Sequence, residues 1–322
     1  MTPATHDIFY STISSWQWVA HTQNDMWCRS MADATQLRYF LDNRQPASMG
    51  CVGYVRQKGP WKMLCIMGDC YRTTPSAKQV RDFYKNIPQL GFDIVEINLN
   101  SLYSPEYEVG MRLAGLLRPV GLFSTTLSKY INIQQPLSFD KSWQRNLKQC
   151  QQYELTFNAI EQPSQVDIQT YMQMHNEMIE RKQFSGYLSQ PQLTNLLQDP
   201  HFLLTTVTHQ NNTIAGMVLY KENNNRAVSL YSVTTPEGRN LSASYWLYKE
   251  TFTHLAQNSN VHTFDIGRLA PSNADKNSVF LFKNGIDGQT VQYNGEWLWC
   301  KKKWMPLALY FLKKYVWKRT QV

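Results

Sequence analysis

Hydrophobic positions recur with two different periods along the first third of this chain, and each period predicts one kind of element. In segment 92–100, Val95, Ile97 and Leu99 alternate with polar residues, which is typical of a half-buried strand. Segments 49–56 and 61–67 are also predicted strands, joined by a turn at 57–60. A helix-spaced stripe follows Ser76, a good N-cap, and comprises Val80, Phe83, Tyr84 and Ile87. The order β-β-α-β predicts a small α/β domain.

The second half of the chain has a different order of elements. One helix places an apolar face along 168–179, and predicted strands follow at 203–208, 213–220 and 227–233. A helix over 242–255 leads to a strand that ends at Gly267, and a short helical run over 279–282 stops at 283–285. Two short strands with Asn294-Gly295 as a hairpin turn complete the order. This order predicts an antiparallel meander flanked by helices, an α+β architecture.

The length of the chain predicts its number of domains, and its net charge suggests a class of partner. A length of 322 residues predicts about two domains, and 43% hydrophobic residues suffice for ordinary cores. The formal net charge of +8 favours a polyanionic partner, which is tRNA, a nucleotide-linked substrate or an anionic membrane surface. The alternative is a soluble protein whose surface is simply basic.

The cysteines and the absence of targeting signals predict a cytoplasmic protein. The six cysteines form no CxxC pair, and no histidine spacing completes a zinc site, so we expect buried thiols in a reducing compartment. The alternative is a disulfide between Cys65 and Cys70. No signal peptide and no run of about 18 apolar residues is found, so no spanning helix is expected.

Several short motifs resemble one known family. Phe264-Asp265-Ile266-Gly267, the pair Phe282-Lys283, Gly285 and Tyr293-Asn294-Gly295 resemble the end of the Fem-type peptidyl transferases. The FemAB-like, or BioF2-like, acyltransferases share this pattern, and both groups belong to the GNAT superfamily of N-acyltransferases. The segment from Ser124 to Lys148 and the run Arg181-Lys182-Gln183-Phe184 resemble further motifs of the same family.

The resemblance covers about residues 119–300 well and the first hundred residues more loosely. It implies two GNAT-like domains with mixed, mainly antiparallel sheets flanked by helices. We therefore expect an N-terminal domain at 1–118, a C-terminal FemAB-like domain at 119–300 and a basic amphipathic helix at 301–322.

The resemblance also implies a catalytic role for Lys283. Acyl transfer from an activated carbonyl to an amine needs stabilisation of a tetrahedral oxyanion, and a fixed cation supplies it. The family places the lysine of its Phe-Lys pair there, with Phe282 shaping the adjacent pocket. The alternative for Lys283 is a cation favoured by the C-terminal end of a helix dipole. Asp265 is either a general base or, as a carboxylate at a strand end, a structural hydrogen-bond acceptor.

Other polar residues are candidates for substrate binding. Lys141, Arg145 and Lys148 share one helix face, which is either an anion contact or a solvated charged face. His175 lies on an apolar helix face and is expected to be a core histidine. The candidate substrate-binding residues are Arg145, Lys148, Arg181, Asp265, Arg268 and Tyr293.

The prediction of the acyl donor depends on segment 236–243, which lacks a pyrophosphate-binding turn. Acyl-CoA enzymes of this superfamily usually hold pyrophosphate on a Q/R-x-x-G-x-G/A turn, whose backbone N–H groups cradle the phosphates. Here there is one glycine, Gly238, and Glu237 adds negative charge. This favours Fem-like transfer from aminoacyl-tRNA to an amine of a cell-envelope precursor, of the peptidoglycan type. The alternatives are an acyl-CoA-dependent N-acyltransferase and a non-catalytic binding module. No metal, and no cofactor beyond the acyl donor as co-substrate, is expected.

The C-terminal segment is a separate feature. Residues 301–319 contain seven Lys or Arg, and Trp304, Ala308, Phe311 and Tyr315 line one face of a helix that begins near Pro306. Such a helix suits peripheral contact with an anionic membrane at the inner face. The alternatives are contact with tRNA, and a terminal helix docked on the domain with its lysines outward.

Overall fold

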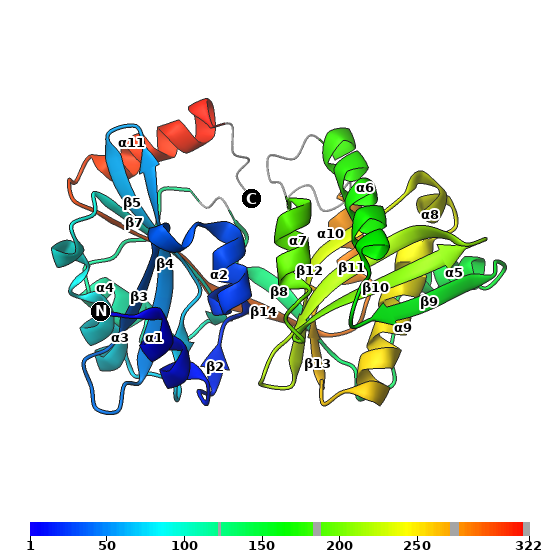
Figure 1. Cartoon of the computed structure of the whole chain (residues 1–322), viewed down its shortest axis with the longest axis horizontal. Helices are drawn as coiled ribbons and strands as arrows, with labels where there is room; N and C mark the ends of the chain where they lie inside the picture. Colours follow the sequence, from blue (N-terminus) through cyan, green and yellow to red (C-terminus); the bar gives the residue numbers. More distant parts are fainter. Residues whose placement is uncertain (122–123, 183–187, 271–276, 318–322) are drawn as a thin grey trace. The chain divides into compact units, whose positions relative to one another are not determined.

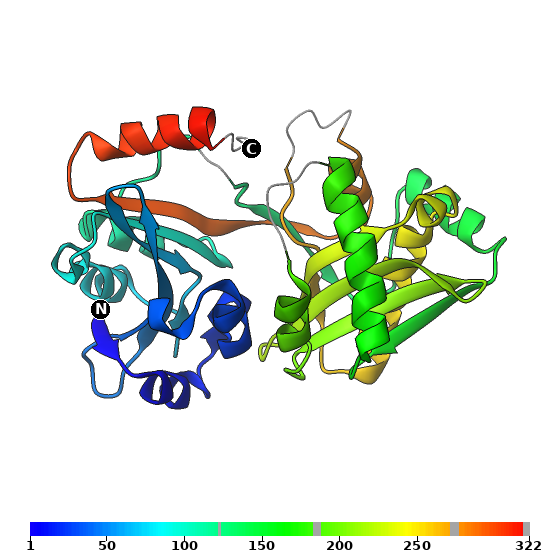
Figure 2. The same cartoon turned by 45° about the horizontal axis from the view of Figure 1, so that its top comes forward.

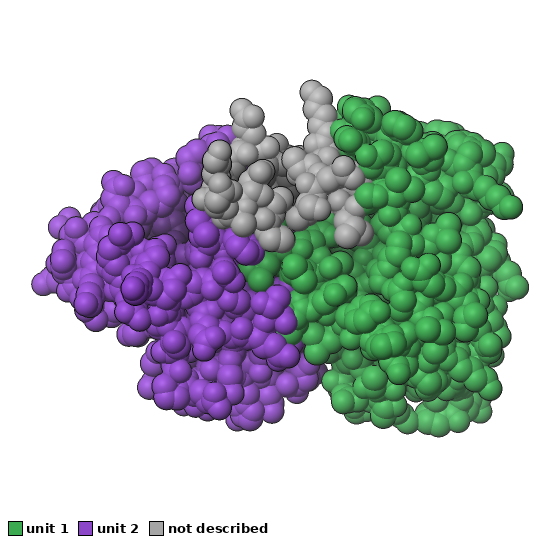
Figure 3. Space-filling view, turned by 180° about the vertical axis from the view of Figure 1, so that it is seen from behind, with its two compact units in different colours: residues 1–127, 268–272, 291–322 green, residues 128–267, 273–290 purple. Residues whose placement is uncertain are grey.

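The computed structural model describes the whole chain except residues 122–123, 183–187, 271–276 and 318–322. The described chain forms two compact units, coloured separately in Figure 3. Unit 1 comprises 1–127, 268–272 and 291–322, and unit 2 comprises 128–267 and 273–290. These limits differ from the expected domains, because the chain returns to unit 1 after Thr290 and adds its last strand and helix there.

Unit 1 is built on a mixed sheet in the order β1-β3-β4-β5-β7-β14, in which only β5 and β7 are parallel. Its strands are β1 (Thr2–Ala4), β2 (Trp18–Val19), β3 (Leu37–Leu41), β4 (Met49–Lys58), β5 (Trp61–Met67), β6 (Cys70–Tyr71), β7 (Ile94–Leu102) and β14 (Gln289–Cys300). Its helices are α1 (His6–Ile13), η1 (His21–Gln23), α2 (Asp25–Met31), η2 (Ala34–Gln36), α3 (Ala77–Tyr84), η3 (Ile87–Leu90), α4 (Pro105–Leu113) and α11 (Met305–Phe311), which continues into a π-helical turn at Leu312–Val316.

Unit 2 has a sheet in the order β8-β13-β12-β11-β10-β9, and here only β12 and β13 are parallel. Its strands are β8 (Leu127–Asn132), β9 (Leu155–Ile160), β10 (Phe202–His209), β11 (Asn212–Lys221), β12 (Arg226–Thr234) and β13 (Thr263–Asp265). Its helices are α5 (Lys141–Cys150), α6 (Gln165–Lys182), α7 (Gln190–Leu196), α8 (Pro236–Asn240), α9 (Ala243–Asn258) and α10 (Ser278–Asn284).

The alternating side chains of β11 show how helices cover both faces of the unit 2 sheet (Figure 1). Met217 and Leu219 point into the core that α9 closes with Leu247 and Phe252. Gly216 faces the other way, and the ring of Tyr171 on α6 would lie 3.0 Å from any Cβ placed there. The glycine therefore lets α6 pack directly on the strand backbone.

Both units share one topology. In each, an antiparallel run of strands ends in a strand that pairs in parallel with a later strand, and the segment that joins these two strands contains helices. In unit 1, β5 pairs with β7 from Met63 to Met67. In unit 2, β12 pairs with β13 only from Arg226 to Val228. The parallel strands part beyond these residues, and we call this point the fork of each unit.

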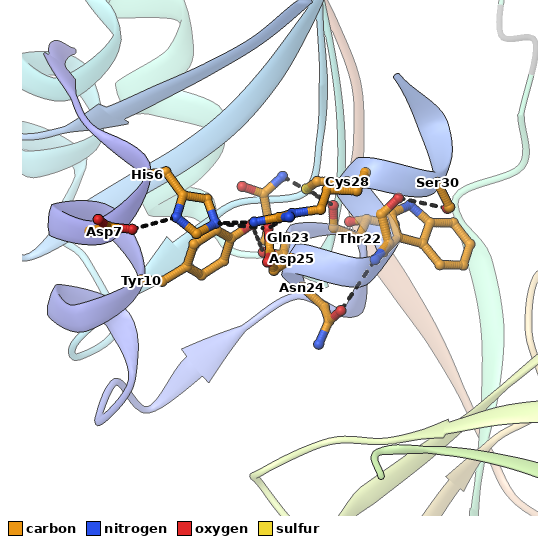
Figure 4. Close-up of polar contacts among 11 residues, drawn as sticks. His6, Asp7, Tyr10, Thr22, Gln23, Asn24, Asp25, Cys28 and Ser30 are labelled. Carbon is orange, nitrogen blue, oxygen red and sulfur yellow. Dashed lines mark hydrogen bonds and ion pairs between the residues drawn. The ribbon is translucent and has the colours of Figure 1, made fainter. Parts of the chain in front are cut away.

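Polar side chains of η1 bind backbone groups next to the fork of unit 1. Gln23 is buried there, and its amide donates to the carbonyls of Met67, at 2.7 Å, and Val52, at 3.1 Å. Its carbonyl oxygen accepts from the N–H of Val52, and the hydroxyl of Thr22 also donates to Met67. Figure 4 shows Thr22 and Gln23 together with the polar contacts that tie α1 to α2. The Thr22 hydroxyl and the Gln23 amide thus satisfy the carbonyl of Met67 at the end of β5, and Gln23 also pairs with Val52 of β4, which lies beyond the β4–β5 pairing.

Most predicted elements are confirmed, and one is wrong. The expected strands at 49–56, 61–67, 203–208, 213–220 and 227–233 are present, as is the helix capped by Ser76. The hairpin at Asn294-Gly295 is wrong, because β14 is a single strand that runs through both residues. Gly295 has a positive φ of 67° and marks a bulge against β7. Both a turn and this type of bulge use a glycine with positive φ, so the dipeptide alone predicted the wrong one.

We expect Gln23→Met to lower the free energy of unfolding by about 2–4 kcal/mol, because at similar side-chain volume it removes the partners of the backbone N–H and carbonyl of Val52 and leaves the carbonyl of Met67 with the Thr22 hydroxyl alone. Urea unfolding measures this change. The matched control is Gln17→Met at an exposed position, which should stay within about 0.5 kcal/mol of the wild type. Equal stabilities for the two variants would contradict the stabilising role of Gln23.

Candidate active site

The candidate site lies at the fork of unit 2. The parallel pairing stops at Val228 and Asp265, while β12 continues to Thr234. Leu230 is an extra residue on β12, because Leu219 pairs with Ser229 and Val218 pairs with Tyr231. A bulge next to a sheet opening is a common feature of functional sites, since it redirects the side chains around it.

Lys283 reaches this fork from α10. Gly267, which follows β13, has a positive φ of 78°. A Cβ at Gly267 would lie 3.4 Å from the Nζ of Lys283 and 3.2 Å from the carbonyl oxygen of Ser229. The lysine amine, the strand end and the β12 backbone therefore meet at one point.

Hydrogen bonds to backbone carbonyls fix the end of α10 that carries Lys283. The indole Nε1 of Trp143 donates to the carbonyl of Phe282 at 2.7 Å. The ammonium of Lys129 donates to the carbonyls of Asn284 and Ile286 at 2.8 Å and 2.9 Å. The last carbonyls of a helix have no partner within the helix, so these donors satisfy them and hold the turn in place.

Aromatic rings surround Phe282, which is partly buried beside Lys283. Its ring centroid lies 4.8 Å from that of Trp143, 4.9 Å from Tyr245 and 5.1 Å from Tyr248. Gly285 is necessary to this packing, because a Cβ there would lie 2.5 Å from the Trp143 ring. Phe282 is thus held among aromatic rings beside Lys283, and its role in shaping an adjacent pocket stays a prediction.

The environment of Lys283 favours loss of its proton. Burial lowers the pKa of the Lys283 ammonium from 10.5 to about 8, and the charge of the Asp265 carboxylate opposes that shift. Below pH 8 the site holds a cation that is poorly solvated, and such a cation binds a developing negative charge more strongly than a hydrated one.

Asp265 is held as a hydrogen-bond acceptor. Its carboxylate is buried and accepts from the hydroxyl of Ser128 at 2.6 Å and from the N–H of Gly267 at 2.9 Å. These bonds shape the turn after β13. The geometry favours the structural role considered for Asp265 over that of a general base.

The other candidate residues lie in different surroundings. Arg145 and Lys148 are exposed on α5, the helix that supplies Trp143, and Arg181 is exposed near the end of α6. Gln183 and Phe184 of the family-like run lie outside the described residues.

Arg268 and Tyr293 belong to unit 1. The guanidinium of Arg268 donates to the side-chain carbonyl of Asn98 at 3.0 Å and to the backbone of Thr125, and it lies 5.6 Å from the Tyr293 ring. The structure brings Phe282, Lys283 and Asp265 together, and it gives Arg268 and Tyr293 contacts within unit 1.

A cluster of hydroxyl groups at the fork was missed by the sequence analysis. The hydroxyl of Tyr248 lies 3.2 Å from that of Ser229 and 2.9 Å from that of Ser232. Tyr248 is buried on α9 and contacts the Phe282 ring. The available signal was the pair of serines within the buried strand 227–233, where an apolar residue is the usual choice.

Segment 236–243 is the position at which a pyrophosphate-binding turn would be expected. Its residues instead contact other parts of the protein. Residues 236–240 form the single turn α8, and a Cβ on Gly238 would lie 2.3 Å from the carbonyl oxygen of Ile214. Ser242 begins α9 with a positive φ of 58°, and its hydroxyl donates to the side chain of Asn146 at 2.7 Å. Glu237 contacts His209 at 2.7 Å.

The structure also bears on the predictions for His175, the cysteines, metal ligands and membrane-spanning helices. His175 is buried between Tyr171 and Tyr231, as expected of a core histidine. The six cysteines are free thiols, including Cys65 and Cys70. Among the described residues, no group of three or more His, Cys, Asp or Glu side chains is arranged to hold a metal ion. Within the same residues, no helix is long and apolar enough to cross a membrane.

Comparison with known proteins identifies the fold. No protein-family model and no curated protein sequence matches the chain. Among solved structures, a tandem GNAT protein from the clavulanic acid biosynthesis pathway aligns with a TM-score of 0.56 at 9% identity, over 93% of this chain and 97% of that one. The fold is therefore that of a tandem GNAT protein, which confirms the predicted fold class.

Two other solved structures are more similar in fold. FemX aligns with a TM-score of 0.72 at 10% identity, over 97% of this chain and 99% of that chain. The C-terminal domain of a putative lysylphosphatidylglycerol synthetase from Agrobacterium fabrum aligns with a TM-score of 0.59 at 13% identity, over 87% and 88%. The resemblance to FemAB-like proteins, first seen in short motifs, thus extends to the fold of nearly the whole chain.

The lowered pKa of Lys283 predicts a specific pH dependence of stability. Unfolded lysine titrates near 10.5 and the folded residue near 8. Between these values the unfolded chain binds a proton that the folded chain has lost, so the free energy of unfolding rises with pH. The rise attributable to Lys283 is at most about 3 kcal/mol.

Urea unfolding across this pH range tests the shift by comparing the wild type with Lys283→Met. The exposed Lys78 supplies the control Lys78→Met, whose curve should run parallel to that of the wild type. If the Lys283→Met curve also runs parallel, the pKa of Lys283 is not lowered.

Proposed function

We propose that this protein is an N-acyltransferase whose reaction takes place at the fork of unit 2. An amine nitrogen attacks the carbonyl carbon of an activated acyl group, and the carbonyl oxygen becomes an oxyanion. The amide forms as the bond to the leaving group breaks, and the proton lost by the amine ends on the leaving group or in solvent. The Lys283 ammonium stabilises the oxyanion. The observation that carries this proposal is the poorly solvated Lys283 cation at a strand fork.

The family resemblance and the fold support the choice of reaction. The Phe282-Lys283 pair resembles the Phe-Lys pair of FemAB-like acyltransferases, and FemX shares the fold along nearly the whole chain. Tyr248 and the hydroxyls of Ser229 and Ser232 add a polar wall at the same fork. The alternative of a non-catalytic module gives no reason for a lysine held in surroundings that disfavour its own charge.

The donor that we propose is aminoacyl-tRNA. Segment 236–243 lacks the second small residue of a pyrophosphate turn, and the groups of Gly238, Glu237 and Ser242 already have contacts within the protein. The net charge of +8 suits a polyanionic donor. Arg145, Lys148 and Arg181 are exposed cations available for its phosphates. Transfer from acyl-CoA is the second candidate, because other GNAT proteins share the fold.

The acceptor that we propose is an amine of a cell-envelope precursor. The Fem-like motifs and the likeness to FemX favour a precursor of the peptidoglycan type. The name of a second neighbour, a lysylphosphatidylglycerol synthetase, refers to an aminoacylated lipid. That name supports an aminoacyl group as the one transferred.

We expect Lys283→Met to lower kcat by about 100-fold or more with a small change in KM, because it removes a contact made in the transition state. The wild-type rate should fall as pH rises through about 8, where Lys283 loses its proton. Lys283→Arg keeps its charge at high pH and should lose this fall, whatever its absolute rate.

Rates with aminoacyl-tRNA and a precursor amine measure this effect, with Lys78→Met as control. A wild-type rate that rises through pH 8 would show that the neutral amine is the active form. Full activity of Lys283→Met would remove Lys283 from the mechanism.

We expect no binding of acetyl-CoA in calorimetry at sub-millimolar concentration, because segment 236–243 offers no cradle for pyrophosphate. Binding of aminoacyl-tRNA should be detectable and should weaken steeply with salt. Tight binding of acetyl-CoA would instead favour the acyl-CoA-dependent reaction. If neither donor binds the intact protein, the enzyme assignment fails.

A further inference from the structure

The C-terminal helix α11 docks on unit 1 by one of its faces. Met305 and Leu309 are buried against Met63, Ile94 and Leu298 of the sheet. One turn further on, Lys313 is buried and forms an ion pair with Glu96. This corrects part of the sequence-based expectation for a docked helix, which placed the lysines outward.

The opposite face of the same helix is apolar and exposed. It carries large side chains at helical spacing, which we call the outer stripe, and their exposed fractions are 56% for Trp304, 53% for Leu307, 49% for Phe311 and 60% for Tyr315. Val316 beside them is also exposed. Figure 2 shows α11 lying along unit 1 beside the hairpin of β4 and β5. A docked helix normally places polar residues on its outer face, so the outer stripe needs an explanation.

Lysines surround the outer stripe. Lys301, Lys302 and Lys303 are exposed just before the helix. At its other end Lys314 lies 5.3 Å from the Tyr315 ring, and Lys58 on the hairpin tip lies 5.5 Å from the ring of Trp317. Segment 301–322 contains no Asp or Glu. The surface therefore joins an apolar strip to a rim of positive charge.

This chemistry matches the interface of an anionic bilayer more closely than the alternatives. Tryptophan and tyrosine favour the headgroup level, leucine and phenylalanine enter the acyl boundary, and lysine binds anionic headgroups. A second copy of the chain would bring two lysine rims together, and like charges oppose that contact. An RNA backbone would bind the lysines but would leave Leu307 in water.

We propose that the outer stripe and its lysine rim form a docking surface for an anionic lipid bilayer, on which the protein binds peripherally. Trp304, Leu307, Phe311 and Tyr315 enter the interface, while Met305 and Leu309 keep the helix on unit 1. The proposal goes beyond acyl transfer and does not depend on it, because it rests on a different unit and on other residues.

Cosedimentation of the full chain with lipid vesicles tests this surface. The probes are vesicles of phosphatidylcholine alone and of phosphatidylcholine with about one-third phosphatidylglycerol. We expect binding to the anionic vesicles, which weakens as salt rises from about 0.05 M to about 0.5 M, and little binding to the neutral ones. Truncation after Cys300 is unsuitable as a test, because it would also remove Met305 and Leu309 from the core.

Surface variants separate the two parts of the docking surface. The triple variant Lys301→Gln, Lys302→Gln and Lys303→Gln should lower the partition coefficient about 100-fold, since each cation contributes about fivefold. The double variant Trp304→Ser and Phe311→Ser should lower it at least about tenfold. The variants spare Met305, Leu309 and Lys313 and remove only an exposed ion pair of Lys301 with Asp93 and a ring contact of Trp304 with Trp61, so melting temperatures should stay close to that of the wild type.

Matched controls use equally exposed residues on other elements. Val166→Ser replaces an apolar side chain on α6 that is 69% exposed. The triple variant Arg44→Gln, Arg72→Gln and Lys78→Gln removes the same charge from exposed positions outside α11. Both should bind anionic vesicles within about threefold of the wild type.

Each alternative occupant of the outer stripe predicts a different experimental result. Absence of binding to anionic vesicles, equal binding to neutral ones, or equal losses in variants and controls would overturn the proposal. Self-association of the free protein that the outer-stripe variant abolishes would assign the surface to a second copy. Binding of total tRNA that depends on the outer stripe, with no binding to vesicles, would assign it to RNA.

Discussion

The candidate site depends on keeping a lysine ammonium partly away from water without losing the helix that carries it. Desolvation of a cation is unfavourable, so Lys283 would move toward solvent unless its backbone were fixed. Trp143 and Lys129 fix it by donating to the carbonyls of Phe282, Asn284 and Ile286. Asp265 offsets part of the cost with its charge, yet its own lone pairs are held by Ser128 and Gly267. The result is a cation with a low pKa that remains in place.

The two units show how one topology serves different purposes. In unit 1 the Thr22 hydroxyl and the Gln23 amide bind the carbonyl of Met67 at the fork, and Gln23 also binds Val52 of the neighbouring strand β4. In unit 2 the fork carries Lys283, the Ser229 carbonyl and the hydroxyl of Tyr248. An amide that pairs with backbone groups stabilises the fold, whereas a poorly solvated ammonium costs stability. This contrast makes unit 2 the stronger candidate for chemistry.

The sequence predicted the elements of this fold well wherever the apolar period was long, as in β10, β11 and α9. It failed at Gly295, because a bulge and a turn need the same backbone conformation and only the partner strand decides between them. For the site, a family motif pointed to Lys283. The anchoring by Lys129 could not be predicted, because 154 positions separate it from Lys283 and no local period connects them. The hydroxyl cluster of Ser229, Ser232 and Tyr248 likewise depends on the packing of α9 against β12.

For the C-terminal helix too, the sequence pattern alone did not decide which contacts form. The helix also suggests why a docked helix suits a membrane surface. Periodicity identified an aromatic face and a basic segment, but only the burial of Met305 and the pairing of Lys313 with Glu96 decide which face points outward. A free amphipathic peptide must fold when it reaches a bilayer and loses conformational entropy in doing so. Here the core contacts of α11 order the helix before it meets lipid. Binding then requires less ordering, so a short outer stripe and a few lysines can hold the protein reversibly.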